Sequence, residues 1–554
     1  MILKFVSFLL LFGHAHPYNI VVYSPTESKS HMKTNAQIAD VLAQNGHNVT
    51  LFEVHYDEEP GTIPNIVKYA RYESHTFDWE NRTNEANLKG FIQGMFNQRN
   101  IITATLNNDL YHDRKVEACD YLLNNTDILE ALREGQYDVY IGEQLDLCGT
   151  GLSHQAGIPV HVWLSSCPLP EYMTSLLGIP IMSSFTPAVL QNDMNGDKMG
   201  FFARIQNMFR SYSNYVGFTG SAERITEVFR KRWPESPSVS EIAAKSPIVL
   251  VNSNEFINFP RLTTSRIIEI GGHSLTALDE PAEDNSTATL IEDLLNEELV
   301  DVVVFSLGSV VKTQWLPREV RNNIVEAFKE LQDYQIIAKI SVDDVETKAK
   351  LANLSHVKVM DWIPQTQLLA HPKTKLFVTH AGYSSLLEAA WYGVPVLAMG
   401  VFGDQMHNAE IPERNGWGKS FDKNILVDTP LPFAESVKNI IGYPQYAKKA
   451  QRIKQILRNQ IPSPKDRLVN AFTMLETLNG QLPELLPASV ELSTFQMYNL
   501  DVYIAFILCV LLSLWSIAGI FAAVGRCCDR LGNKFRTVKP NEHEAALLND
   551  HPEP

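Results

Sequence analysis

Residues 361–405 contain a short apolar run that leads through a turn of small residues into a helix, and no other stretch constrains the fold as much. Residues 376–378, Leu-Phe-Val, are typical of a buried strand, and residues 380–382, His-Ala-Gly, are typical of a tight turn. Apolar residues then recur at helical spacing, and Ser384 and Ser385 are suited to cap that helix. Backbone N–H groups at the start of a helix bind anions, so the pattern predicts a phosphate site.

Three side chains near this turn suit a nucleotide joined to a sugar. His380 stands where it could donate a hydrogen bond to a phosphate, and Trp362 offers a flat face on which a base can stack. Glu388 lies further along the helix, where a carboxylate could accept hydrogen bonds from sugar hydroxyls. Together these features predict a nucleotide-sugar site.

The same stretch resembles the signature of the UDP-glycosyltransferase family, in its membrane-bound branch that includes the UDP-glucuronosyltransferases. The motifs W-x-P-Q, T-H-x-G-x-x-S-x-x-E and D-Q occur here in the family's order and spacing. The resemblance implies UDP-sugar contacts from Trp362, Gln365, His380, Gly382, Glu388, Asp404 and Gln405, which match the family, and from Ser384, at a position that the family also uses.

Two positions depart from the family pattern. Ala381 stands where the family usually has its first Gly after the His, and Ser384 stands where it usually has Asn. Alanine is a small change. Loss of the Asn amide removes a donor beside the diphosphate, so Ser384 is the position most expected to alter donor use.

A second turn of small residues follows the strand predicted at residues 301–305. Ser306, Gly308 and Ser309 allow a backbone to approach phosphate closely, and the resemblance implies a diphosphate contact there. An ordinary strand-to-loop turn is the alternative. Lys339, near the end of the strand predicted at residues 335–340, stands where the family often has Arg; it keeps the charge but loses the fork geometry.

The N-terminal half opens with a strand, a helix and a strand, predicted at residues 19–23, 32–45 and 49–54. This opening is Rossmann-like but lacks G-x-G-x-x-G, so dinucleotide binding is not predicted. His31 lies at the strand-to-helix turn, where a side chain can point into a cleft. By position alone, a capping or surface histidine is the alternative; the resemblance of Ser30-His31 implies a general base.

A histidine base needs a carboxylate that holds its tautomer and stabilises the imidazolium. Residues 138–142 are typical of a strand, and Glu143 and Asp146 follow it. In the resemblance, counting back from Cys148-Gly149 favours Glu143, where the family more commonly has Asp. Asp146 is the rival, and either residue could instead be a solvated loop acid.

Apolar and aromatic residues recur at helical spacing in the region 168–235. We interpret them as core packing; the alternative is an acceptor pocket or a membrane-facing entry for apolar substrates. The positions are Phe201, Phe202, Ile205, Met208, Phe209 and Tyr212.

Composition limits the cofactors and partners. The formal net charge of −16 argues against a nucleic-acid surface. No Asp-x-Asp triplet and no cysteine pair with metal-ligand spacing occur, so no metal is expected. Six cysteines are present; among Cys119, Cys148 and Cys167 at most one disulfide can form, which leaves one thiol free.

The two ends of the chain predict its compartment. Residues 1–15 have a lysine, an apolar run and small residues at the cleavage position, which is typical of a secretory signal peptide. Residues 502–524 are uncharged, apolar and long enough to cross a bilayer. Lys and Arg are absent from residues 480–501 and frequent in residues 525–539, so the positive-inside rule predicts a type I single-pass protein.

Five glycosylation sequons fit this topology: Asn48, Asn81, Asn124, Asn285 and Asn353. The tail lacks the dilysine signal common in the family, so residence in the endoplasmic reticulum is implied by the resemblance alone. Membrane lipid is an expected partner, and a homo-oligomer is compatible with this interpretation.

The predicted fold class is α/β: two facing Rossmann-like domains of the GT-B type plus a C-terminal transmembrane helix. At 554 residues the chain exceeds what one core can hold. The expected parts are a signal peptide (1–15), an acceptor-binding domain (16–277), a linker (278–300), a UDP-sugar domain (301–480), a juxtamembrane spacer (481–501), the membrane helix (502–524) and a cytosolic tail (525–554).

The resemblance implies transfer of a sugar from UDP-glucuronate or UDP-glucose to small lipophilic acceptors, with inversion and without a metal or other cofactor. His31 would act as base and Glu143 or Asp146 as its partner. Three hypotheses stay open: a glucuronosyltransferase, a glucosyltransferase of the same family, and a weakly active binding protein. Ala381, Ser384 and Glu143 motivate the third.

Overall fold

The computed structural model describes residues 17–26, 28–56, 67–77, 85–96, 101–190, 196–275, 291, 292, 294, 295 and 301–536. The signal peptide predicted at 1–15, the sequons at Asn81 and Asn285, most of the predicted linker and the end of the tail lie outside these residues. The chain separates into two compact units, Met1–Val490 and Glu491–Pro554.

The first sheet of the larger unit contains, among the described residues, seven parallel strands in the order β3-β2-β1-β4-β5-β6-β7. Their bounds are β1 Asn19–Pro25, β2 Asn48–His55, β3 Arg71–Thr76, β4 Val139–Glu143, β5 Val160–Ser165, β6 Val249–Val251 and β7 Ile267–Glu269. The helices associated with this sheet are α2 Lys29–Gln44, α4 Ile101–Asn125, α5 Ile128–Glu134, α6 Leu147–Gln155, α7 Glu171–Leu176, α8 Phe201–Arg230 and α9 Val239–Ala244. Helix α3 Glu85–Met95 follows β3 in the chain, but its buried Ile92 belongs to the core of the second α/β domain.

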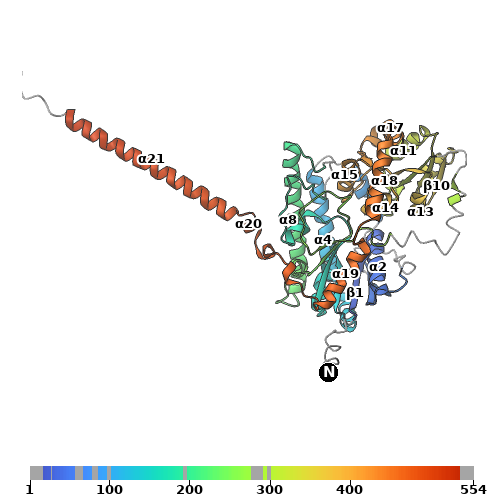
Figure 1. Ribbon diagram of the computed structural model, residues 1–554, viewed down its shortest axis with the longest axis horizontal. Helices are drawn as coiled ribbons and strands as arrows, with labels where there is room; N and C mark the ends of the chain where they lie inside the picture. Colours follow the sequence, from blue (N-terminus) through green and yellow to red (C-terminus); the bar gives the residue numbers. More distant parts are fainter. Residues whose placement is uncertain are drawn as a thin grey trace, which may run out of the picture. The chain divides into compact units, whose positions relative to one another are not determined.

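Helices cover both faces of this sheet, because its strands are apolar on both sides. In β1, Val21 and Tyr23 pack in a core with residues of α4, α6 and α8, whereas Ile20 and Val22 pack in a core with α2. The long helices α4 and α8 lie side by side (Figure 1). Because successive side chains of a strand point to opposite faces of the sheet, a single strand contributes residues to two cores.

The second sheet contains six parallel strands among the described residues, in the order β10-β9-β8-β11-β12-β13. Their bounds are β8 Val302–Ser306, β9 Gln335–Lys339, β10 Val357–Met360, β11 Thr374–Thr379, β12 Val396–Ala398 and β13 Gly418–Ser420. The helices that follow these strands are α11 Arg318–Lys329, α12 Val345–Leu351, α13 Gln365–Ala370, α14 Tyr383–Tyr392, α15 Gln405–Asn415, α16 Ile425–Asp428, α17 Leu431–Gly442, α18 Pro444–Arg458 and α19 Pro464–Thr477.

Helix α19 returns from the second half of the chain to the first sheet. Its buried residues Leu468, Phe472 and Leu475 share a core with β1 and α2. Arg467 donates to both carboxylate oxygens of Glu255, at 2.9 and 2.7 Å. The first domain is therefore complete only when this late segment is in place.

Three local expectations are wrong in detail. The helix predicted at residues 32–45 is α2, which begins at Lys29, so His31 lies inside its first turn. Ser384 and Ser385 do not cap α14: its N-cap is Gly382, and both serines lie within the helix. Residues 431–457 are helical in two pieces, α17 and α18, with Tyr443 in extended conformation between them.

The third wrong expectation concerns the aromatic residues at the start of α8, which are not core. Their side chains are exposed, with Phe202 the most exposed at 82%. The helical spacing was correct, but the face that packs inward is the polar one, with Asn207 and Asn214 buried. The exposed set is Phe201, Phe202, Ile205, Met208, Phe209 and Tyr212.

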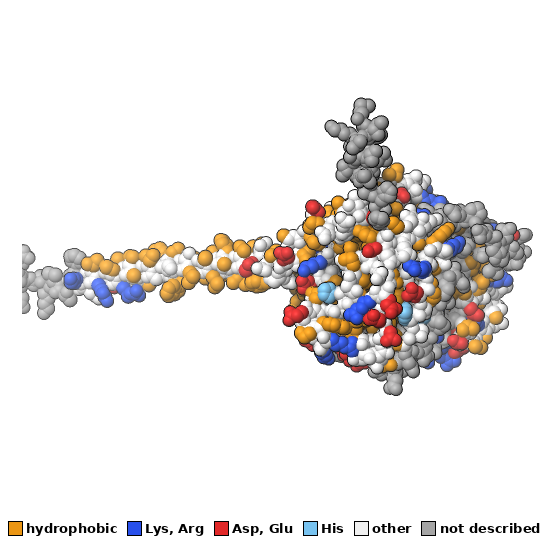
Figure 2. All heavy atoms as spheres, turned by 90° about the horizontal axis from the view of Figure 1, so that it is seen from below, with side chains coloured by type: hydrophobic (Ala, Val, Ile, Leu, Met, Phe, Trp, Pro, Cys, Tyr) orange, Lys and Arg blue, Asp and Glu red, His pale blue; other side chains and the backbone are white. Residues whose placement is uncertain are grey.

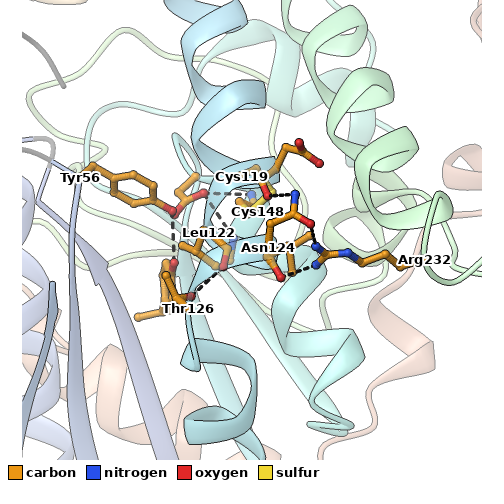
Figure 3. Close-up of a disulfide and its surroundings, with 12 residues drawn as sticks. Tyr56, Cys119, Leu122, Asn124, Thr126, Cys148 and Arg232 are labelled. Carbon is orange, nitrogen blue, oxygen red and sulfur yellow. Dashed lines mark hydrogen bonds between the residues drawn. A yellow bond between two sulfur atoms is a disulfide. The ribbon is translucent and has the colours of Figure 1, made fainter. Parts of the chain in front are cut away.

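Cys119 in α4 and Cys148 at the start of α6 form a disulfide (Figure 3). Cys167 is a buried free thiol. This agrees with the expectation of one bridge and one free thiol. Close to it, Arg232 at the end of α8 donates to the Leu123 carbonyl and to the amide oxygen of Asn124. The bridge and these contacts fix the end of α4 to its neighbours.

The smaller unit contains α20 Thr494–Met497 and α21 Leu500–Arg536. By length and composition, residues 500–534 of α21 can cross a membrane, and the predicted span 502–524 lies within them. Figure 2 shows apolar side chains along this helix and Lys and Arg side chains toward its C-terminal end.

We predict that replacing Cys119 and Cys148 together by Ser lowers the free energy of unfolding. The bridge closes a loop over 29 positions, which corresponds to roughly 3.5 kcal/mol of lost chain entropy in the unfolded state. Thermal unfolding measures the effect, with Cys167→Ser as the matched control. An unchanged melting temperature in the double variant would contradict the prediction.

Candidate active site

His31 and Glu143 meet where the strand order of the first sheet reverses. The strands after β1 extend to one side of it and β4 to β7 extend to the other, so the loops after β1 and β4 diverge and leave a crevice. His31 lies in the first turn of α2, which follows β1, and Glu143 is the last residue of β4. Nδ1 of His31 lies 3.4 Å from Oε2 of Glu143.

Glu143 is almost fully buried, yet its environment favours the carboxylate. Burial alone would raise the pKa of Glu143, but the charge of His31 and hydrogen bonds from His31 and Ser166 outweigh it and lower that pKa. Ser166, which follows β5, donates its hydroxyl to Oε2 of Glu143. A buried anion is thus held against the imidazole.

Asp146 has a different set of contacts. Its Oδ1 accepts from the backbone N–H groups of Cys148 and Gly149 at 2.9 and 3.3 Å, so it caps α6. Its Oδ2 accepts from the hydroxyl of Tyr56 at 2.9 Å. The carboxylate of Asp146 therefore has a structural use at the start of a helix.

The second sheet reverses its order between β8 and β11, and His380 follows β11 at that point. Its ring lies between two glycines: a Cβ on Gly308, which follows β8, or on Gly382 would stand 2.5 Å from ring atoms. Gly308 also has a left-handed backbone, with φ +78°. Both positions require glycine because the imidazole occupies the space of a side chain.

His380 is uncharged at neutral pH. Burial, aided by the positive charge of Lys339, lowers the pKa of His380 to about 4. A neutral imidazole can still donate one hydrogen bond through its N–H group. The side chain can thus bind a phosphate oxygen without adding charge to the site.

Lys339, at the end of β9, supplies a cation beside this turn. Its ammonium donates to the Gly308 carbonyl at 2.8 Å and lies 4.2 Å from the centre of the Trp362 ring. Burial and the charge of Lys29 lower the pKa of Lys339 to about 8. Ser306 is buried at the end of β8 and accepts from the Gly308 N–H, and Ser309 lies half-exposed in the same turn.

The N-terminus of α14 points its backbone N–H groups toward the same region without a side-chain cap. The preceding Ala381 has φ +61°, a conformation that favours the glycine usual in the family. Further along α14, Glu388 accepts from the amide of Gln365 at 2.7 Å, and the same amide donates to Ser385 at 3.3 Å. The Trp-x-Pro-Gln motif is thereby joined to the helix that follows the turn.

Asp404 and Gln405 form the start of α15. The amide oxygen of Gln405 accepts from the backbone N–H groups of Val401 and Phe402, at 3.1 and 3.2 Å, so it braces the loop before the helix. Asp404 accepts from the side chain of Asn408 at 2.7 Å. Removal from water raises the pKa of Asp404, and the nearby charge of His31 partly counteracts this.

The two half-sites belong to one cleft. Lys33, two residues after His31 in α2, lies 3.6 Å from the carboxylate of Glu388 in α14. The charge of His31 acts on Asp404 from the opposite domain, and that of Lys29 acts on Lys339. The candidate base therefore faces the candidate nucleotide-sugar site.

Sequence reasoning missed two residues of this cleft. Ser166 follows β5, the neighbour of β4, so the order of the strands could have indicated it. Lys33 carried no signal of its own, because an exposed lysine on a helix is common.

Two facing α/β domains with a candidate site between their switch points are the arrangement of the GT-B fold. The crystal structure of Medicago truncatula UGT71G1 complexed with UDP-glucose resembles this chain with a TM-score of 0.55 at 15% identity, and the match covers 83% of this chain and 98% of that one. The structure of TcCGT1 in complex with UDP gives a TM-score of 0.54 at 14% identity, covering 84% and 100%. Likeness at this identity shows the fold.

The family follows from the sequence itself. Residues 20–536 match the family described as UDP-glucoronosyl and UDP-glucosyl transferase, and the chain belongs to it. A Caenorhabditis elegans relative, described as a candidate UDP-glucuronosyltransferase (ugt-48), is 31% identical over 507 residues, which cover 91% of this chain and 94% of the relative. Human UDP-glucuronosyltransferase 2A2 is 28% identical over 433 residues, covering 78% and 76%. The predicted resemblance is confirmed, and a UDP-sugar is the donor class.

We predict that Gly382→Ala weakens UDP binding by about tenfold or more, because the added Cβ displaces the His380 ring from its place. Isothermal titration calorimetry with UDP measures this. Gly442→Ala in α17 is the matched control, since nothing lies within 4 Å of its Cβ position. Equal affinity in the two variants would contradict the role given to the glycine.

We predict that UDP affinity falls as the pH rises above about 8. The pKa of Lys339 is about 8 in the free protein, and the charged form favours an anionic ligand, so binding raises that pKa. The affinity for UDP is therefore at its maximum below this pH and declines above it, by at most about tenfold per pH unit. Lys339→Arg removes the decline because Arg stays charged. A wild-type affinity that is flat up to about pH 9.5 would contradict this.

Proposed function

We propose that the chain transfers the sugar of UDP-glucuronate to a hydroxyl group of small lipophilic acceptors in one inverting step. The observation that carries the proposal is the contact of His31 with the buried carboxylate of Glu143, opposite the turn that holds His380. UDP-glucose is the alternative donor. The description of relatives as UDP-glucuronosyltransferases supports glucuronate.

His31 acts as the general base in this proposal. It removes the proton of the acceptor hydroxyl while that oxygen attacks the anomeric carbon, and the bond from this carbon to the UDP oxygen breaks with its electron pair on UDP. Glu143 holds the imidazole and stabilises the imidazolium that forms. We assign this role to Glu143 rather than Asp146, because Glu143 contacts the ring and Asp146 caps α6.

The residues of the second domain bind the donor. Lys339 and the N-terminus of α14 offset the charge that develops on the leaving UDP, and neutral His380 donates a hydrogen bond to it. Trp362, which is 66% exposed, offers its ring to the base. Glu388, braced by Gln365, and Asp404 accept from sugar hydroxyls, and Ser306, Ser309 and Ser384 complete the polar lining.

No metal is required in this scheme, because protein groups take the charge of the diphosphate. Among the residues the structure describes, no group of three or more His, Cys, Asp or Glu could hold a metal ion. Two of the three substitutions that motivated a weakly active binding protein are accommodated here. The longer side chain of Glu143 reaches His31, and Ala381 is fully buried in the turn without displacing the turn.

We further propose that the chain is a type I membrane protein with both domains in the lumen of the endoplasmic reticulum. The helix at residues 500–534 supports a single span, and the cations after it support a cytosolic tail. Apolar acceptors would then be concentrated at the membrane beside the enzyme.

We predict that His31→Ala lowers kcat by about two to four orders of magnitude while the Kd for UDP changes by less than about threefold. UDP release from UDP-glucuronate and from UDP-glucose, with a phenolic acceptor, measures turnover and donor preference together. The exposed His154, replaced by Ala, is the matched control. Full activity in His31→Ala would show that the base is a different group, and activity that is lost with a chelator and restored by manganese would contradict metal independence.

A further inference from the structure

The first half of α8 has its polar side inward and its apolar side outward. Asn207 is 1% exposed and Asn214 is 8% exposed, whereas Phe202 and Phe209, which face away from them, are 82% and 61% exposed. A helix on the surface of a soluble domain has the opposite arrangement. We call the exposed set the α8 stripe: Phe201, Phe202, Ile205, Met208, Phe209, Tyr212 and Val216.

Buried hydrogen bonds fix this orientation. The side chain of Asn207 accepts from the Ala188 N–H and donates to the carbonyls of Ser183 and Thr186, at 2.7–2.8 Å. The amide of Asn214 donates to the buried carboxylate of Glu171 at 2.6 Å. Rotation of the helix to hide its aromatic residues would leave these groups unpaired, at a cost of about 1–3 kcal/mol for each buried group.

The second half of the same helix is ordinary. Ala222, Ile225, Val228 and Phe229 are buried there, and the exposed positions carry charges. The apolar exposure thus begins with the helix and ends near Val216. At 100° per residue the seven positions of the stripe fall within an arc of about 120°.

Charge around the stripe differs from the rest of the chain. Residues 198–222 contain Lys198, Arg204 and Arg210 and no Asp or Glu, although the net charge of the chain is −16. Lys198 and Arg204 are exposed beside the aromatic residues. Aromatic and aliphatic residues with neighbouring cations are typical of helices that lie in the interface of a bilayer with anionic lipids.

We propose that the α8 stripe docks on the surface of a phospholipid bilayer. The inference rests on the membrane anchor of the proposed function and is independent of the proposed chemistry. Because α21 of the same chain can cross a membrane, lipid is present at high effective concentration, a condition that a soluble partner does not meet. The stripe is roughly 24 Å long and about 10 Å wide, far below the roughly 800 Å² per partner of a stable dimer.

Docking gives the enzyme a second contact with the membrane besides its helix. The aromatic rings would enter the headgroup region, and Lys198 and Arg204 would meet lipid phosphates. The first domain, which takes the acceptor in the proposed function, would then be held at the surface where apolar molecules accumulate.

A fluorescence experiment on the full chain tests this. Phe209→Cys is introduced after Cys509, Cys527 and Cys528 are replaced by Ser, which leaves Cys167 buried. The thiol is labelled with the dye NBD, and the protein is reconstituted into vesicles of phosphatidylcholine with a minor share of phosphatidylserine and of nitroxide-labelled lipid. Glu227→Cys, exposed on the second half of α8, is the matched control.

We expect the nitroxide lipid to quench the dye at position 209 by at least about twofold and to leave the dye at position 227 unaffected. Equal emission and equal quenching at the two positions, in protein that floats with the vesicles, would overturn the proposal. A dye at 209 that is shielded from water but not quenched, with cross-linking between two copies, would also overturn it and indicate self-association.

The fluorescence measurement does not depend on catalytic turnover. UDP release is measured separately, so a failure of the proposed chemistry is distinguishable from a failure of lipid docking. Protein that does not float with the vesicles would refute the anchor and the docking together.

Discussion

Parallel strands direct all their carboxyl ends to one edge of a sheet, and the rest of this structure depends on that constraint. In each domain the strand order reverses once near the middle, between β1 and β4 or between β8 and β11. The loops on either side of the reversal diverge, and the side chains of the candidate site lie there. His31 and Glu143 are therefore neighbours although 112 positions separate them (143 − 31). The same geometry brings Gly308 against His380.

The two domains differ in which groups of the candidate site carry charge. On the first sheet, a buried carboxylate is kept ionised by the imidazole and a serine hydroxyl, so a proton can be accepted nearby. On the second sheet, burial keeps His380 neutral and leaves the positive charge to Lys339 and to a helix terminus. A site for an anionic leaving group thus gains donors without a buried charge on each of them.

Much of this could be predicted from sequence because it depends on local order. A short apolar run, a turn of small residues and an apolar helix identify the anion site, and the position of His31 after the first strand follows from the same logic. The exact starts of helices could not be predicted. The N-cap of α14 is Gly382 rather than Ser384, so the helix has already begun when the chain reaches the serines. The face of α8 could not be predicted, since periodicity gives the stripe but not its direction. That direction depends on the segment around residues 183–190, which binds the asparagines.

The return of α19 to the first sheet has a consequence for biosynthesis. A ribosome delivers the N-terminal strands first, but the core on one face of their sheet contains Leu468, Phe472 and Leu482. Those residues emerge only after the whole second domain has been translated. Until then, β1 and α2 present an uncovered apolar surface, which chaperones would have to shield. The order of folding is in this respect opposite to the order of synthesis: the domain that is made first is the last to be closed.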